Sequence, residues 1–132
     1  MTRMTIDQLL ATARSGLFRL SPAQALQAMR SGAALIDIRG DSQITRDGTI
    51  PGALIIARNV LEWRLDPASQ HRHPRAPRLG DPTILLCDQG YQSSLAAATL
   101  KQLGFAQASD VDGGFQAWRQ AGLPVNLPAG PA

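Results

Sequence analysis

Residues 83–100 read TILLCDQGYQSSLAAATL, and this stretch decides the fold class. It opens with a mostly apolar run, 83–87, which predicts a buried strand. A short loop containing Gly90 follows, and the alanine- and leucine-rich sequence from Leu95 predicts a helix that ends at Gly104. Cys87, the one cysteine of the chain, therefore stands at the end of a strand and faces the start of a helix.

Two further apolar runs predict strands before this stretch, at residues 33–38 (AALIDI) and about 53–56. A fourth strand is expected near residues 108–111. Helical segments separate these runs. Strands that alternate with helices predict an α/β fold with a mainly parallel sheet that is covered by helices on both faces.

Capping signals place the helices. The sequences TIDQ from Thr5 and SPAQ from Ser21 are capping boxes, which predict helices over about 6–15 and 22–31.

Two later helices and two loops complete the chain. Asn59, with Glu62 three residues on, predicts the cap of a short helix, and a last helix ends at Gly122. Residues 39–49 are polar and rich in turn formers. Residues 67–82 contain four prolines and predict a surface loop.

Length and composition bound the class of protein. With 132 residues, 44% of them hydrophobic, the chain fits a single domain with its own core. We expect residues 1–132 to form that domain, with a core at about 20–125, a helical extension at about 1–19 and a flexible tail at about 126–132. Apolar runs fall short of the roughly 18 residues of a membrane span, so no membrane partner is expected.

Charge and cysteine content exclude further classes. The one dense basic cluster, Arg72, Arg75 and Arg78, lies in a proline-rich stretch, so nucleic-acid binding is not expected. His71 and His73 have no third cysteine or histidine nearby, so no metal is expected. A lone cysteine cannot form an internal disulfide, which favours a reduced cytoplasm.

The loop after Cys87 favours thiol chemistry. Ligands of open α/β sheets bind at the carboxyl ends of the strands, and the loop 88–93 can turn its backbone N–H groups toward one centre. The helix that follows adds its positive end. Such donors favour the thiolate, which is the nucleophilic form of cysteine. The alternative is that Cys87 is a small core residue and that Ser93 merely caps the helix.

Four motifs in order resemble the rhodanese-like superfamily over about residues 20–125. They are LIDIR at 35–39, GTIPGA at 48–53, CDQGYQSSLAA at 87–97 and VDGGFQAWRQAGLPV at 111–125. The resemblance implies a three-layer α/β fold around a central, mainly parallel five-stranded sheet. It also implies that Cys87 is a catalytic residue that carries a persulfide and that no cofactor is needed. The implied substrate-binding loop consists of Asp88, Gln89, Gly90, Tyr91, Gln92 and Ser93.

One loop position departs from the family pattern. Similar single-domain members usually have arginine where Gln92 stands, and glutamine supplies no charge for an anionic donor, which puts thiosulfate use in question. Arg58, just after the second predicted strand, is a candidate to bind the donor instead; the alternative is a solvated surface arginine. Phosphatase relatives need a longer loop that ends in arginine, whereas the sixth residue after Cys87 is Ser93.

Other conspicuous residues have structural interpretations. Asp37 and Arg39 resemble the family's structural pair, and we expect them to brace the end of the first strand. Trp118 is expected in the core. Trp63 is expected either in the core or at the mouth of the Cys87 site. Residues 113–114 are two glycines that fit a tight turn rather than a phosphate loop.

Two functions remain open. The first is a sulfurtransferase that moves a sulfane sulfur through Cys87 from a small donor, such as thiosulfate, polysulfide or a persulfide, to a thiol, cyanide or protein acceptor. The second is a non-catalytic rhodanese module that senses or relays sulfur or docks a partner. Cys87 favours the first, while Gln92 and the stretch 58–82 favour an unorthodox donor or a protein partner.

Overall fold

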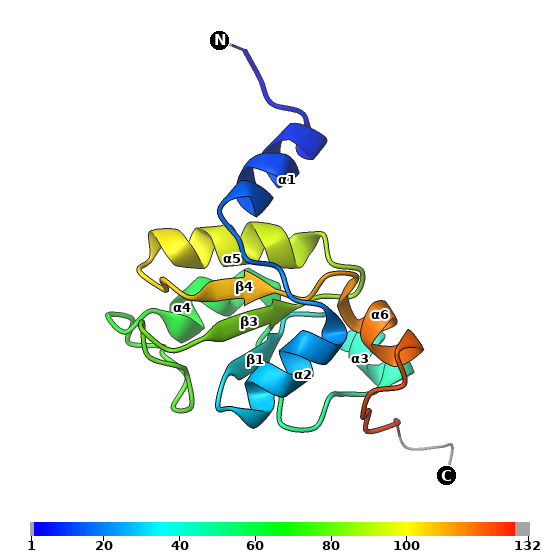
Figure 1. Cartoon of the computed structure of the whole chain (residues 1–132). Helices are drawn as coiled ribbons and strands as arrows, with labels where there is room; N and C mark the ends of the chain where they lie inside the picture. Colours follow the sequence, from blue (N-terminus) through cyan, green and yellow to red (C-terminus); the bar gives the residue numbers. More distant parts are fainter. Residues whose placement is uncertain (1, 129–132) are drawn as a thin grey trace.

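The computed structural model describes residues 2–128 and contains a parallel sheet of four strands (Figure 1). The strands are β1 (Ala34–Asp37), β2 (Leu54–Ile55), β3 (Thr83–Leu86) and β4 (Ala108–Asp110), in the spatial order β2-β1-β3-β4. Each neighbouring pair is parallel. The α/β class with a parallel sheet is thereby confirmed.

Helices cover both faces of this sheet (Figure 1). The helices are α1 (Ile6–Ser15), α2 (Pro22–Arg30), α3 (Asp41–Asp47), α4 (Leu61–Leu65), α5 (Gln92–Gln102) and α6 (Gly114–Gln120). The core residues of α4 and α5 pack on one face, and those of α2 and α6 pack on the other. α1 lies against α5, outside the layer that touches the sheet.

The alternation of strand side chains divides the core into two clusters. Ile36 and Leu85 pack with Leu100 of α5 on one face. Leu35 and Ile84, one residue earlier in each strand, pack with Trp118 of α6 on the other. Because both faces are buried, the central strands are mainly apolar rather than alternating between apolar and polar residues. Trp118 is fully buried, as predicted.

The sheet has four strands within residues 2–128, not the expected five. At the edge of β4, a single parallel bridge joins Leu20 to Val111 where a fifth strand would lie. The amide of Leu20 donates to the carbonyl of Asp110 at 2.9 Å, but the next residue, Ser21, already caps α2. Since Pro22 has no N–H to donate, the pairing cannot extend.

Both predicted capping boxes are present. The side chain of Thr5 accepts from the amide of Gln8, and the side chain of Gln8 accepts from the amide of Thr5. Ser21 and Gln24 make the same reciprocal pair at the start of α2. These local signals therefore located the first two helices correctly.

Two helix predictions were incomplete or wrong. α3 lies within residues 39–49, for which the sequence predicts a polar turn. The sequence does not reveal this helix because its seven residues include one aliphatic side chain and so show no helical periodicity. Asn59 lies inside a 3-10 turn, η1 (Arg58–Val60), that leads into α4, and among the described residues no side chain caps either element.

Trp63 is 59% exposed, so its predicted core position is wrong. Residues 67–82 form no helix or strand, as expected of a surface loop.

The described residues after α6 pair with the segment that follows α3. Asn126 forms an antiparallel bridge with Thr49, with hydrogen bonds of 3.0 and 2.7 Å. Residues 129–132 of the expected tail lie outside the described residues. Across residues 2–128, each helix is too short or too polar to cross a bilayer.

Candidate active site

Cys87 directly follows β3, at the carboxyl edge of the sheet. Its sulfur accepts hydrogen bonds from the amide of Gly90 at 3.1 Å and from the amide of Ser93 at 3.3 Å. The side chain belongs to the core cluster on the α5 face, yet it also borders an open cavity. The expected convergence of loop amides on the sulfur is therefore present.

The start of α6 fixes the first half of the loop. The amide of Phe115 donates to the carbonyl of Cys87 at 2.8 Å, and the amide of Gln116 donates to the carbonyl of Asp88 at 3.1 Å. In a trans peptide the N–H points opposite to the C=O. The amides of Asp88 and Gln89 are therefore directed away from α6.

Gly114 makes this close approach feasible. Its φ is +61°, and a Cβ at this position would lie 2.5 Å from the carbonyl oxygen of Cys87 and 2.7 Å from that of Asp88. Only glycine fits both the left-handed backbone and the contact. The predicted turn at residues 113–114 thus has a second role, since it brings the amides of α6 onto the loop.

Two arginines fix the second half of the loop from behind. Arg14, in the last turn of α1, and Arg19, between α1 and α2, each donate from Nη2 to the carbonyl of Gly90 at 2.8 Å. Arg14 also donates to the hydroxyl of Ser94 at 3.1 Å, and its guanidinium lies 5.5 Å from the centre of the Tyr91 ring. Gly90 itself has a φ of +87°, so the loop turns there on a glycine.

A buried carboxylate connects Arg19 to the start of α5. Asp110 is fully buried, and it accepts from the hydroxyls of Ser93 at 2.8 Å and Ser94 at 2.7 Å. Arg19 donates to both of its oxygens, at 3.0 and 3.2 Å. Burial opposes the charge of Arg19, but the hydrogen bond to Asp110 and the negative charges of Asp110 and Asp112 raise the pKa of Arg19 above its ordinary value.

The cavity beside Cys87 has a volume of about 310 Å³ and is open to solvent. Its lining consists of Gln43, Cys87, Asp88, Gln89, Tyr91 and Gln92. Among residues 2–128, no cationic side chain lines it. Gly90 and Ser93, the other members of the expected binding loop, are buried and face the sulfur through their amides.

Arg58 lies elsewhere. Its Nη1 donates to both carboxylate oxygens of Glu62, at 2.8 and 3.0 Å, so its charge is already paired. It is absent from the lining of the Cys87 cavity, as is Trp63. The structure thus places six of the seven predicted binding residues at the sulfur or the cavity and leaves Arg58 outside.

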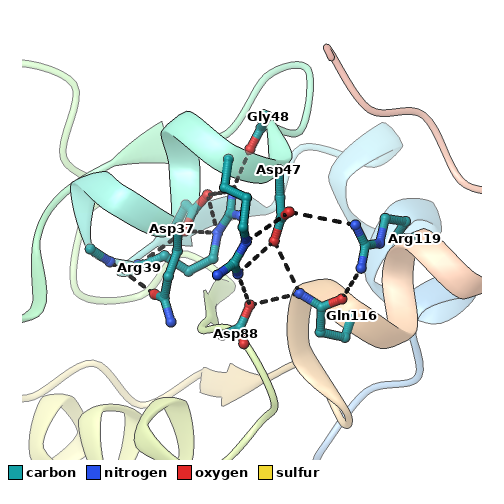
Figure 2. Close-up of polar contacts among 10 residues, drawn as sticks. Asp37, Arg39, Asp47, Gly48, Asp88, Gln116 and Arg119 are labelled. Atoms are coloured by element: carbon teal, nitrogen blue, oxygen red, sulfur yellow. Dashed lines mark hydrogen bonds and ion pairs between the residues drawn. The ribbon is translucent and has the colours of Figure 1, made fainter. Parts of the chain in front are cut away.

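A polar network adjoins the loop on the side of α3 and α6 (Figure 2). Gln116 donates to Asp88 at 2.8 Å and to Asp47 at 3.2 Å, while Arg119 lies 3.5 Å from Asp47. The hydrogen bond from Arg46 lowers the pKa of Asp47 to about 2, against the effect of burial and with help from Gln116 and Arg119. Asp47 is therefore ionised near neutral pH and ties α3 to α6.

The expected pair of Asp37 and Arg39 braces the same edge. Arg39 Nη2 donates to Asp37 at 2.8 Å and to the carbonyl of Gly48 at 2.7 Å (Figure 2). Its guanidinium lies 3.8 Å from the centre of the Phe115 ring. Arg39 thereby joins the end of β1 to the end of α3 and the start of α6, which confirms the predicted structural role.

Sequence reasoning missed Arg14, Arg19 and Asp110. The hydrogen bonds that bring Arg14 and Arg19 to Gly90, and Arg19 to Asp110, join residues 71 to 91 positions apart, so no local pattern could pair them. Asp110 offered one weak signal, since a carboxylate within a predicted strand of a covered sheet is rarely buried unless it is paired.

Comparison with known proteins identifies the family to which this chain is similar. The family model for the rhodanese-like domain matches residues 21–121. The thiosulfate sulfurtransferase GlpE of Pseudomonas entomophila is 39% identical over 101 residues, which cover 76% of this chain and 84% of that protein. GlpE of Pseudomonas putida strain GB-1 is 37% identical over 115 residues, which cover 86% of this chain and 94% of that protein.

Solved structures share the whole architecture. A protein of unknown function from Rhodopseudomonas palustris, described as a possible tyrosine phosphatase, is 33% identical and covers 96% of this chain and 97% of its own with a TM-score of 0.86. The polysulfide-sulfur transferase of Wolinella succinogenes, at 20% identity and a TM-score of 0.69 over 89% of this chain and 84% of its own, shares the fold alone. By its family-model match and its relatives, this chain belongs to the rhodanese-like domain family.

Proposed function

We propose that the chain is a rhodanese-type sulfurtransferase in which Cys87 carries the transferred sulfur as a persulfide. The observation that carries this proposal is the pair of amides, from Gly90 and Ser93, that donate to the sulfur of Cys87 at the edge of an open cavity. Backbone donors held in place stabilise negative charge on sulfur without reorganisation. The names of the relatives, thiosulfate sulfurtransferases at 33–39% identity, support the same reaction class.

The reaction is a double displacement that needs no external oxidant. The Cys87 thiolate attacks the outer sulfur of the donor, the donor's S–S bond breaks, and the leaving group departs with the electron pair. The product is a Cys87 persulfide whose outer sulfur carries the negative charge. An acceptor thiolate or cyanide then attacks that outer sulfur, and the Cys87 thiolate is the leaving group. The amides of Gly90 and Ser93 stabilise the Cys87 thiolate by hydrogen bonding in both half-reactions.

The cavity favours donors that need no cationic side chain. Gln92 lines it at the position where similar proteins have arginine, and Arg58 is paired with Glu62. Thiosulfate releases sulfite, a dianion whose charge a guanidinium would stabilise. A small persulfide releases a thiolate with one negative charge, and a polysulfide releases a shorter polysulfide whose charge is spread over its sulfur chain. We therefore expect polysulfide or a persulfide to charge Cys87 faster than thiosulfate. A small thiol or a protein thiol in a reduced cytoplasm is the expected acceptor.

Phosphatase chemistry, suggested by the description of the Rhodopseudomonas protein, fits this loop poorly. A phosphatase of this fold needs a guanidinium that forks onto the phosphate at the end of the loop. The sixth residue after Cys87 is Ser93, whose amide faces the sulfur and whose hydroxyl is bound to Asp110. A non-catalytic module would not require amides aimed at a thiol. Both alternatives therefore rank below sulfur transfer.

Intact-protein mass spectrometry tests the proposal. The chain is exposed in turn to thiosulfate, polysulfide and 3-mercaptopyruvate, with Cys87→Ser as the control, and a phosphatase assay with p-nitrophenyl phosphate runs in parallel. We expect the mass to rise by one sulfur atom with polysulfide, and a thiol or cyanide to remove that sulfur. A chain that gains no sulfur at Cys87 from any donor, or that hydrolyses the phosphate ester, contradicts the proposal.

A further inference from the structure

The two amides that face Cys87 belong to a closed ring of hydrogen bonds. Gly90 donates from its amide to the sulfur of Cys87 and accepts at its carbonyl from Arg19. Arg19 donates to Asp110, and Asp110 accepts from the hydroxyl of Ser93. Ser93 closes the ring, because its own amide donates to the same sulfur. Arg19 is therefore the link between the two residues that bind the thiolate.

Arg14, in the last turn of α1, supports the same loop. Its guanidinium bridges the hydroxyl of Ser94 and the carbonyl of Gly90, and its central carbon lies over the ring of Tyr91. Tyr91 in turn lines the cavity at Cys87. One guanidinium thus contacts the peptide that turns the loop, the start of α5 and a wall of the cavity.

The orientation of one peptide unit explains why these contacts matter for the thiol. The carbonyl of Gly90 and the amide of Tyr91 belong to the same planar unit, so they point in opposite directions. Arg14 and Arg19 hold that carbonyl on the rear side of the loop. The amide of Tyr91 is thereby directed away from both arginines, and the glycine, which rotates freely, is fixed in its left-handed conformation.

We propose that Arg14 and Arg19 are positioning residues that hold the amides of the Cys87 loop on the sulfur. Both precede residue 21, where the match to the family model begins, so this chain supplies them from its N-terminal extension. Neither lines the cavity, so they act on the loop and not on the substrate directly. The expected effect on the rate of persulfide formation rests on the proposed function, whereas the effect on the loop amides can be measured whether or not that function holds.

Arg14 provides the cleaner test, because the residues of α1 all keep some exposure to solvent and Arg19 neutralises the buried Asp110. Arg14→Ala should therefore still fold, with a Tm only a few degrees lower, while Arg19→Ala leaves a buried carboxylate without its cation. Arg14→Lys keeps the charge but cannot bridge Gly90 and Ser94 with one nitrogen. Arg3→Ala removes a charge from the same extension at a residue whose side chain bonds only to the neighbouring Met4 within the described residues.

The experiment measures two quantities on each variant. Hydrogen exchange by NMR reports the amides of Gly90 and Ser93, with Leu85 as a core reference. The rate of persulfide formation from polysulfide reports chemistry. For Arg14→Ala we expect exchange at Gly90 to accelerate about tenfold relative to Leu85, and the maximal charging rate to fall about tenfold. The half-saturating donor concentration should stay within about twofold, since Arg14 does not touch the donor.

Each outcome has one meaning. If Arg14→Ala exchanges the amide of Gly90 and forms the Cys87 persulfide at the wild-type rates, the inference is overturned. Full rescue by Arg14→Lys also overturns it, because charge alone would then suffice. If Arg3→Ala changes exchange and charging as much as Arg14→Ala does, the inference is likewise overturned. If the wild-type chain gains no sulfur from any donor, the proposed function fails, and the exchange data still decide whether the two arginines position the loop.

Discussion

Ser93 and Asp110 are joined by a hydrogen bond of 2.8 Å from hydroxyl to carboxylate, while the amide of the same serine faces the sulfur of Cys87. Asp110 is fully buried and also balances Arg19. A buried carboxylate that serves three donor residues is costly to replace, because its partners lose their acceptor together.

The first prediction concerns this carboxylate. Asp110→Asn should lower the free energy of unfolding by about 3 kcal/mol, because it leaves Arg19 and the hydroxyls of Ser93 and Ser94 with a neutral partner that accepts through one oxygen only. Urea unfolding measures the change. Asp112→Asn is the matched control, since Asp112 is mostly exposed and its pair with Arg19 should contribute less than about 1 kcal/mol. Equal effects of the two substitutions would refute the prediction.

A second prediction follows from the steric role of Gly114. Gly114→Ala and Gly122→Ala both place alanine in a left-handed backbone, at φ of +61° and +71°. At Gly122 no atom lies within 4 Å of the added Cβ, so the cost should be the backbone strain of about 1 kcal/mol. At Gly114 the Cβ meets the carbonyls of Cys87 and Asp88, which should add about 2–3 kcal/mol and displace the loop.

Unfolding in urea and iodoacetamide modification of Cys87 report these two effects. Gly114→Ala should change the rate of modification, whereas Gly122→Ala should leave it as in the wild type. A Gly114→Ala chain with wild-type stability would show that α6 does not fix the loop.

The third prediction is a pH dependence. The pKa of Asp47 is lowered from 3.8 to about 2 in the folded chain, chiefly by the hydrogen bond from Arg46. A carboxylate with a lowered pKa stabilises the fold fully above its unfolded value, and this contribution is lost as the pH falls through the folded value. Stability should therefore drop between about pH 4 and pH 2, and Asp47→Asn should flatten that part of the profile. Urea unfolding at stepped pH measures it, with the exposed Asp7→Asn as control.

The fourth prediction concerns donor choice. Gln92→Arg adds a cation at the cavity beside Cys87, and it should raise the rate of charging by thiosulfate about tenfold through a charge-assisted hydrogen bond. The rate with polysulfide should change less. Gln102→Arg adds the same charge at the other end of α5 and serves as the control. If Gln92→Arg is charged by thiosulfate and by polysulfide at the wild-type rates, then the residue at position 92 does not select the donor.

Sequence reasoning found the parts of the site that local physics determines. The run before Cys87, the glycine at position 90 and the helix that follows are contiguous, so a strand, a loop and a helix start could be inferred together. The capping boxes at Thr5 and Ser21 fixed two helix starts for the same reason.

What the sequence left hidden depends on contacts between distant segments. Arg14 looks like any exposed arginine in the last turn of a helix, until α1 packs on α5 and brings it to Gly90. Arg58 was assigned by its place after a strand, but Glu62, one helical turn away, competes for its charge. Trp63 was expected inside because of its residue type, and the short α4 instead buries Leu61 and Leu65.

The N-terminal extension has a practical consequence for anyone who isolates the domain. A fragment cut where the family match begins, at Ser21, would retain every strand, the described core residues, Cys87 and the open cavity. It would lack both guanidiniums behind Gly90. Such a fragment would look complete by homology, yet it would leave the buried Asp110 without its cation, and its loop would close on the sulfur only part of the time. A low activity in a trimmed version of this chain would therefore reflect the loss of the first 20 residues as much as the properties of the domain itself.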